Sequence, residues 1–246
     1  MNDNRKFFFS TFNTSKGKRD VLLSEIRKRK KRRFTTQLHT KNYKLKTDAL
    51  PWPNYGYGYV TIIDMPLIEF SDKGLYCPAG GFYIDPWRQV DKAVITHAHS
   101  DHARWGSKHY LCHHHTKPIL EVRLGRDNQY QSIEWNEPID INGVKVSLHP
   151  AGHIIGSSQI RVEHKGEVWV VSGDYKVEND GMSGEFEPVK CHTFITESTF
   201  GLPIYYWKPQ AEIFSNIQSW VRQNKEAGKS SILIAYSLGK AQRLLP

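Results

Sequence analysis

Cysteine and long apolar runs are the features that this sequence has least of. Its three cysteines, Cys77, Cys112 and Cys191, are far apart and show no C-x-x-C spacing, which excludes a disulfide framework and a cysteine-based zinc site. No stretch approaches the roughly 18 consecutive apolar residues of a membrane-spanning helix, and the Phe triplet at 7–9 is too short for a signal peptide. We therefore expect a cytoplasmic protein.

Acidic residues are scarce at the amino-terminal end, where positive charge is concentrated. The formal net charge of the 246 residues is +9, and residues 1–50 hold 15 Lys and Arg against 4 Asp and Glu. The basic run at 27–33 favours contact with nucleic-acid phosphates, although a solvated tail unrelated to the fold, or a targeting segment, explains the same composition. We predict a basic, disordered tail and linker over residues 1–58.

The sequence after this tail predicts an α/β fold built on short buried strands. Apolar or alternating runs occur at 82–84, 92–95, 144–148, 160–162, 168–171 and 193–195. Shortly after such runs come polar, metal-competent side chains, namely Asp85, His97, His153, Asp174 and Glu197. Open α/β sheets place their ligand sites at the carboxyl ends of strands, so we expect a site there.

Two further elements are expected near the carboxyl end. The apolar residues between 213 and 221 recur at helical spacing, and Gly228 marks the end of that helix. The apolar run at 231–236 predicts one more buried strand.

The strongest signal is the run from His97 to His102, which places three imidazoles and the carboxylate of Asp101 within six positions. A shuffled chain of this composition would contain H-x-H-x-D-H about once in a thousand trials. Imidazole and carboxylate are ligands of zinc and similar ions, and the lack of nearby cysteine favours a catalytic over a structural zinc site; exposed surface histidines are the alternative. The consecutive histidines at 113–115 instead predict a surface turn, because neighbouring side chains diverge.

This run resembles the signature motif of the metallo-β-lactamase superfamily. His153 resembles the ligand of its third motif, Asp174 that of its fourth, and Asp85 the carboxylate that supports the ligand loop from behind. The resemblance implies an αββα sandwich over residues 59–203 and two divalent metal ions, zinc first and manganese second. It assigns one ion to His97, His99 and His153, the other to Asp101 and His102, and both to Asp174.

Two later segments resemble the β-CASP branch of this superfamily, whose members cut DNA or RNA. Glu197 resembles the acidic residue of the first β-CASP motif, which pairs with a later histidine that protonates the leaving oxygen; an ordinary strand-end carboxylate is the alternative. Residues 236–243 resemble a strand-to-helix segment, so residues 204–246 would begin the β-CASP cap domain. The chain ends at Pro246, before the two later histidine motifs of the branch, which leaves those histidines unassigned and the activity of this chain open.

Within this branch, the run from Pro66 to Gly106 is most similar to bacterial ligase-associated DNA exonucleases. The resemblance implies a DNA exonuclease in DNA repair, in which a hydroxide activated by two ions attacks the phosphodiester and Asp101, Asp174 and Glu197 are catalytic. Its partners would be nucleic acid and a DNA ligase or other repair protein. Three alternatives stay open: an RNA-processing nuclease, a small-ester hydrolase of the same superfamily, and a non-catalytic nucleic-acid-binding subunit.

Overall fold

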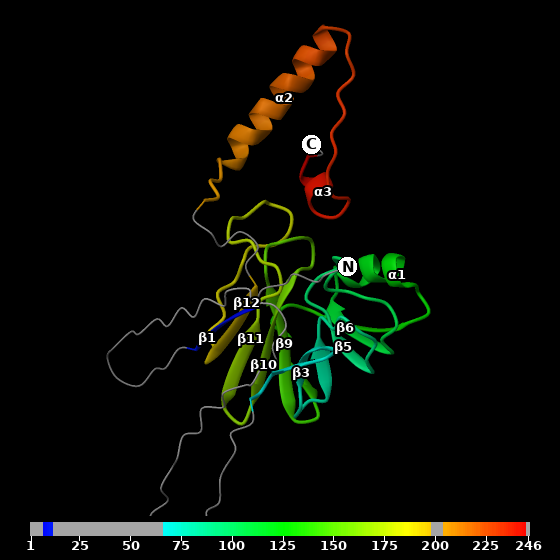
Figure 1. Cartoon of the computed structure of the whole chain (residues 1–246), viewed down its shortest axis with the longest axis vertical. Coiled ribbons are helices and arrows are strands. Elements are labelled where there is room, and N and C mark those ends of the chain that lie inside the picture. Colours follow the sequence, from blue (N-terminus) through cyan, green and yellow to red (C-terminus); the bar gives the residue numbers. More distant parts are fainter. Residues whose placement is uncertain (1–6, 12–65, 198–203, 245–246) are drawn as a thin grey trace, which may run out of the picture. The chain divides into compact units, whose positions relative to one another are not determined.

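The computed structural model describes residues 7–11, 66–197 and 204–244, whose strands form two six-stranded sheets (Figure 1). Sheet A contains, in spatial order, β1 (Phe7–Thr11), β12 (Thr193–Glu197), β11 (Glu167–Val171), β10 (Ser158–His164), β9 (Val144–Pro150) and β8 (Ile139–Ile141). Sheet B contains β2 (Glu69–Ser71), β3 (Gly74–Cys77), β4 (Phe82–Ile84), β5 (Lys92–Val94), β6 (His109–His113) and β7 (Gln129–Ile133). The helices are α1 (Lys117–Leu124), α2 (Gln210–Glu226) and α3 (Lys240–Leu244). None of these described helices is long and apolar enough to cross a membrane.

Strand direction gathers several carboxyl ends at the same edge of each sheet. In sheet B, the strands from β4 to β7 are parallel to one another. In sheet A, β11 and β12 are parallel, and β10 is antiparallel to both β9 and β11. Strands β9, β11 and β12 therefore run in the same direction, and the loops that follow them leave the sheet on the same side.

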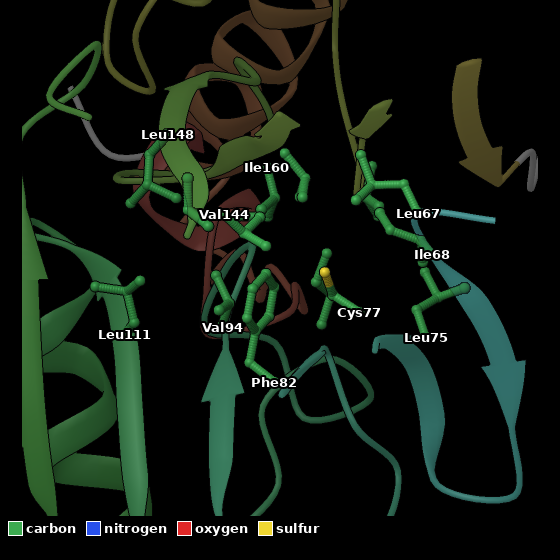
Figure 2. Close-up of a cluster of buried hydrophobic side chains, with 14 of the residues drawn as sticks. Leu67, Ile68, Leu75, Cys77, Phe82, Val94, Leu111, Val144, Leu148 and Ile160 are labelled. Atoms are coloured by element: carbon green, nitrogen blue, oxygen red, sulfur yellow. The ribbon is translucent and has the colours of Figure 1, made fainter. Parts of the chain in front are cut away.

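The two sheets pack face to face through alternate residues of their strands, as the two-residue period of a strand requires. In β9, Val144 and Val146 are buried, whereas Lys145 between them is exposed. The buried layer takes side chains from both sheets (Figure 2), including Leu75, Phe82, Val94 and Leu111 from sheet B and Val144, Val146, Leu148 and Ile160 from sheet A. This apolar layer fixes how far apart the loops of the two sheets lie.

Helix α1 covers the outer face of sheet B. Its buried Leu120 packs in a second apolar cluster with Ala93 of β5 and Tyr110 of β6. The predicted α/β sandwich is confirmed, and of its four expected layers the described residues form the two sheets and this helix layer. On the outer face of sheet A, the loop between β11 and β12 places the Tyr175 ring 6.4 Å from Phe194 of β12.

Strand β1 differs from the disordered tail that we expected over residues 1–58. It pairs antiparallel with β12, with Phe9 opposite Ile195. Phenylalanine and threonine favour strands, and the edge of β12 has backbone groups available for pairing. Residues 7–11 therefore form a strand, although their pairing partner lies far away in the sequence. The rest of the predicted tail and linker, residues 12–58, lies outside the described residues.

The carboxyl-terminal region confirms the predicted helix but not the predicted strand. Helix α2 ends at Glu226, just before Gly228, whose φ is 68°. Residues 231–236 form no strand, and Ile232 and Ile234 are 80% and 95% exposed. The strand prediction was wrong because a strand needs a neighbour for its backbone hydrogen bonds, and none of the described strands pairs with these residues.

Replacing Val146 by alanine tests the layer between the sheets. Val146 is fully buried, and removing its two methyl groups should lower the free energy of unfolding by about 2–3 kcal/mol through lost burial and the cavity left behind. Val122→Ala removes the same groups from a 79% exposed side chain of α1 and should change that free energy by less than about 0.5 kcal/mol. Urea denaturation measures both variants, and equal destabilisation would contradict the assigned core.

Candidate metal centre

The loops at one end of the two sheets carry the polar side chains of the candidate site. In sheet B, β4 leads to Asp85 and the parallel β5 leads to the run 97–102; in sheet A, β9 leads to His153, β11 leads to Asp174 and β12 ends at Glu197. Gly173 allows the loops of the two sheets to approach, because at its φ of 55° an added Cβ would lie 2.7 Å from the side chain of Thr96. A larger residue at 173 would push the two loops apart.

A first group of ligand atoms, all within 4.8 Å of one another, comes from His97, His99, His153 and Asp174. The Nδ1 atom of His99 lies 3.0 Å from His97 Nε2 and 3.2 Å from His153 Nε2. Asp174 Oδ2 lies 3.3 Å from His153 Nε2 and 3.8 Å from His97 Nε2. Zinc bonds of about 2.0–2.2 Å in a tetrahedron place ligand atoms about 3.3–3.6 Å apart. The first group therefore fits one zinc-sized ion.

A second group is formed by His102, Asp174 and Glu197. The Nε2 atom of His102 lies 3.4 Å from Asp174 Oδ1 and 3.2 Å from Glu197 Oε1. Both His102 Nε2 and Glu197 Oε1 are buried without a hydrogen-bond partner in the part of the chain that the structure describes. Buried polar atoms without partners are costly, and a divalent ion between these two would satisfy both. Asp174 thus presents one carboxylate oxygen to each group.

Asp101 is the one expected ligand that belongs to neither group. Its side chain is 55% exposed, and its Oδ2 lies 3.7 Å from His102 Nε2. The family resemblance assigns Asp101 and His102 to the same ion. In the structure, the carboxylate oxygen nearest to His102 Nε2 belongs to Glu197, at 3.2 Å, followed by Asp174 at 3.4 Å. Glu197 therefore belongs to the second group in the structure, and Asp101 lies on the exposed side of His102 outside that group.

Asp85 lies behind the ligand loop. Its Oδ1 accepts the backbone N–H of Thr96 at 2.8 Å, and its Oδ2 accepts the Thr96 hydroxyl at 2.5 Å and lies 2.7 Å from His102 Nδ1. The Thr96 hydroxyl donates its only hydrogen bond to Asp85, so its oxygen accepts a hydrogen bond from Nδ1–H of His97 at 3.0 Å. Both imidazoles therefore carry a proton on Nδ1 and turn Nε2 toward the ligand groups.

Two contacts to the ligand loop could not be foreseen from the sequence. The carbonyl of Leu238 accepts a hydrogen bond from His99 Nε2–H at 3.1 Å, which leaves Nδ1 of His99 to face the first group. Arg123 of α1 donates to the carbonyl of Ala98. A backbone carbonyl carries no signal in the sequence, and Arg123 resembles any other basic residue in the last turn of a helix.

Burial keeps two histidines of the first group, His97 and His153, neutral. Desolvation lowers the pKa of His97 well below its ordinary value, and the charge of His102 acts in the same direction. Burial also lowers the pKa of His153 to about 4, against the opposing effect of Asp174 and with a smaller lowering contribution from Arg243. A neutral imidazole offers the lone pair that a metal ion takes, so this group is prepared for an ion at neutral pH.

The second group has the opposite electrostatics. Burial alone would lower the pKa of His102, but the carboxylates of Asp85, Asp174 and Glu197 raise it well above its ordinary value. Burial, together with the charge of Asp174, raises the pKa of Glu197 to about 7. Burial would raise the pKa of Asp174, but hydrogen bonding and the charge of His102 hold it well below its ordinary range. Positive charge is therefore required among these carboxylates, as a proton or as an ion.

The histidines at 113–115 lie apart from both groups. His113 is buried and stacks on Trp135 with ring centroids 4.1 Å apart, whereas His114 is exposed beside Glu134. The side chains diverge as expected, but the prediction of a surface turn was wrong for His113. His113 is the last residue of β6, and its ring is buried against Trp135. This burial lowers the pKa of His113 to about 4.

Comparison with known proteins places these observations in a family. No protein-family model matches the chain. The chain is 31% identical over 181 residues to "Probable DNA ligase" of Opitutus terrae, covering 72% of this chain and 18% of that protein. It is 27% identical over 209 residues to cleavage and polyadenylation specificity factor 73 of Drosophila melanogaster, covering 80% and 29%, and 28% identical over 120 residues to endoribonuclease YSH1 of Yarrowia lipolytica, covering 48% and 14%. The chain thus spans less than a third of these relatives' length.

Solved structures show weaker, partial likeness. A metallo-β-lactamase from Cronobacter sakazakii is 14% identical with a TM-score of 0.31, covering 36% of this chain and 42% of that one. Zinc-bound PqqB from Methylobacterium extorquens is 12% identical with a TM-score of 0.27, covering 33% and 37%. The curated relatives, the two packed sheets and the ligand groups at their strand ends together support the β-CASP branch of the metallo-β-lactamase superfamily as the family of this chain.

Proposed function

We propose that this chain is the catalytic region of a metal-dependent nuclease that hydrolyses phosphodiester bonds of nucleic acids with two divalent metal ions. Zinc is the first candidate for both ions, and manganese is the second candidate. The observation that carries the proposal is the position of Asp174. Its Oδ2 lies 3.3 Å from His153 Nε2 in the first group, and its Oδ1 lies 3.4 Å from His102 Nε2 in the second. A carboxylate placed in this way could contribute one oxygen to each of two ions, and a pair of ions would suit displacement at phosphorus.

DNA is our first candidate substrate, and exonuclease action in DNA repair is the first candidate role. In support, a relative at 31% identity is named a probable DNA ligase. RNA is the second candidate, since other relatives are named an endoribonuclease and a cleavage and polyadenylation factor. A small-ester hydrolase would share the ligand groups, so what favours nucleic acid is the relationship to these proteins.

The residues of the chain divide into ligands and the groups that orient them. When bound, the ions supply an activated water and neutralise charge on a phosphate oxygen. His97, His99 and His153 would hold the first ion, and burial keeps the His97 and His153 imidazoles neutral. His102, oriented by Asp85, would hold the second ion together with Glu197 and Asp174. Asp101, exposed beside His102, would be a further ligand of that ion.

Digestion of single-stranded DNA, duplex DNA and RNA, each with zinc or manganese, tests the proposed function. We expect metal-dependent cleavage that EDTA abolishes, and a loss of about a hundredfold or more in kcat/KM for Asp174→Asn, because its carboxylate serves both groups. Asp127→Asn, at an exposed position before β7, is the matched control and should leave cleavage unchanged. Hydrolysis of a neutral carboxylic ester without cleavage of any nucleic acid would overturn the proposal. Cleavage of RNA alone would identify RNA, in place of DNA, as the substrate.

Metal content measured by mass spectrometry after dialysis tests the two ligand groups separately. We expect two zinc ions per chain, one after either His153→Ala or His102→Ala, and none in the double variant, because each imidazole belongs to one group only. His109→Ala removes an exposed imidazole of β6 and should keep both ions. A wild-type chain that holds a single ion would contradict the two-ion arrangement.

Zinc affinity of the second group should rise with pH through the neutral range. The pKa of His102 is raised well above 6.5 and that of Glu197 to about 7, so an ion must displace protons from both. His97 and His153 of the first group should contribute little pH dependence in this range, because the pKa of His153 is about 4 and that of His97 is lowered. Zinc titration calorimetry between pH 6 and 8, in buffers of different ionisation enthalpy, measures the protons released; equal proton release by wild type and His102→Ala would count against this assignment.

A further inference from the structure

The segment 237–243 lies directly against the first ligand group. The Leu238 carbonyl accepts from His99 Nε2–H at 3.1 Å. At the next residue, Gly239 with φ 92°, an added Cβ would lie 2.6 Å from Cγ2 of Ile154, the neighbour of His153. The two contacts fix this segment beside the loops that carry His99 and His153.

The turn itself is held by Gln242. Its side-chain oxygen accepts the backbone N–H of Gly239 at 2.7 Å, and its side-chain nitrogen donates to the Ser237 carbonyl at 2.8 Å. The backbone N–H of Arg243 donates to the Gly239 carbonyl at 3.2 Å. The position of Arg243 relative to the ligand loops is thus set by the same turn that touches His99.

The guanidinium of Arg243 is poorly matched by the residues around it. Its side chain is only 22% exposed, yet in the described part of the chain its nearest carboxylate oxygen, Asp180 Oδ2, lies 3.9 Å from its Nε. The Asp180 oxygens already accept the backbone N–H groups of Met182 and Ser183 and the Ser183 hydroxyl. A guanidinium has five N–H donors in a planar fork, and a mostly buried one normally pairs them.

The surroundings favour an anion with several oxygens as the missing partner. The segment that carries Arg243 contacts His99 through the Leu238 carbonyl and approaches Ile154 at Gly239, which holds Arg243 near the loops of the first group. A phosphodiester placed at the two ligand groups brings non-bridging oxygens, which match the guanidinium fork in geometry and charge. A neutral ester offers no such partner.

We propose that Arg243 binds a backbone phosphate of the nucleic acid at or next to the scissile linkage, so that the segment 237–243 supplies a substrate-binding cation to the metal centre. The inference rests on the proposed function and extends it to a residue outside the ligand groups. Arg243 is a binding residue here and takes no part in holding the ions.

A purely structural role for Arg243 makes a different prediction. If the long ion pair with Asp180 holds the loop between β11 and β12 in place, Asp180→Asn should reproduce the effect of Arg243→Gln. If Arg243 binds phosphate, Asp180→Asn should leave substrate binding unchanged, because the asparagine retains one acceptor oxygen for the backbone N–H groups that Asp180 accepts.

The test measures binding of a single-stranded phosphorothioate DNA, which keeps its charge and resists hydrolysis, to the zinc-loaded chain by fluorescence anisotropy at several salt concentrations. For Arg243→Gln we expect about tenfold weaker binding and a plot of log K against log salt that is shallower by about 0.7, the contribution of one phosphate contact on a single strand. Arg243→Lys should keep the slope but bind more weakly than wild type, because an ammonium lacks the planar fork. The basic residues of 1–50 are common to all variants, so the differences report position 243 alone.

The controls separate this inference from the proposed function. Arg222→Gln removes the same charge from an exposed position on α2 and should match wild type in affinity and slope. Wild-type affinity and slope in Arg243→Gln would overturn the inference while the nuclease proposal stands, and so would a matching loss in Asp180→Asn. If the wild-type chain does not bind the oligonucleotide, the nuclease proposal fails, and calorimetry with inorganic phosphate decides the rest: binding that weakens in Arg243→Gln supports an anion site, and its absence overturns that as well.

Discussion

The carboxylate of Asp174 lies between the two ligand groups with one oxygen toward each, and this position links the candidate metal centre to the packing of the sheets. A buried carboxylate is unfavourable unless positive charge lies beside it, and here the raised pKa of His102 shows how strongly that charge is demanded. Asp174 follows Gly173, whose lack of a side chain lets the loop of sheet A meet Thr96 of sheet B. The apolar layer between the sheets therefore sets the distances within the site, so its stability and the site's geometry depend on each other.

Orientation of the ligands comes from contacts on both sides of the ligand loop. Behind it, Asp85 accepts hydrogen bonds from Thr96 and lies 2.7 Å from His102 Nδ1. Its φ of 44° is one that few residues other than glycine adopt, which indicates local backbone strain. In front of it, the Leu238 carbonyl fixes the tautomer of His99. Because the turn that contains Leu238 leads directly into α3, which contains Arg243, the segment that contacts His99 also carries the cation proposed to bind the substrate. Such preorganisation reduces the rearrangement needed when ions and substrate bind.

Elements whose stability is largely local, or whose partners lie close in the chain, were predicted well. Helix α2 satisfies its own backbone, so its apolar spacing and Gly228 were sufficient to place it. The strands on either side of the core were visible from their buried runs. Residues 231–236 show the limit of this reasoning, because an apolar run specifies a strand only where another strand supplies hydrogen bonds. His113 shows the same limit, since a histidine beside two others looks exposed until Trp135 is placed against it.

The donor types of the candidate site could be predicted from the sequence alone: nitrogen and oxygen donors at strand ends, in an order that resembles one superfamily, with the run from His97 to His102 at its centre. Which of these donors lie together could be seen only in the folded chain. It brought Glu197 to within 3.2 Å of His102 Nε2 and left Asp101 exposed, and it placed the Leu238 carbonyl on His99. Sequence patterns reflect the local geometry of residues that are close in the chain. The distances between the ends of distant strands depend instead on how the two sheets twist and pack, which no local pattern specifies.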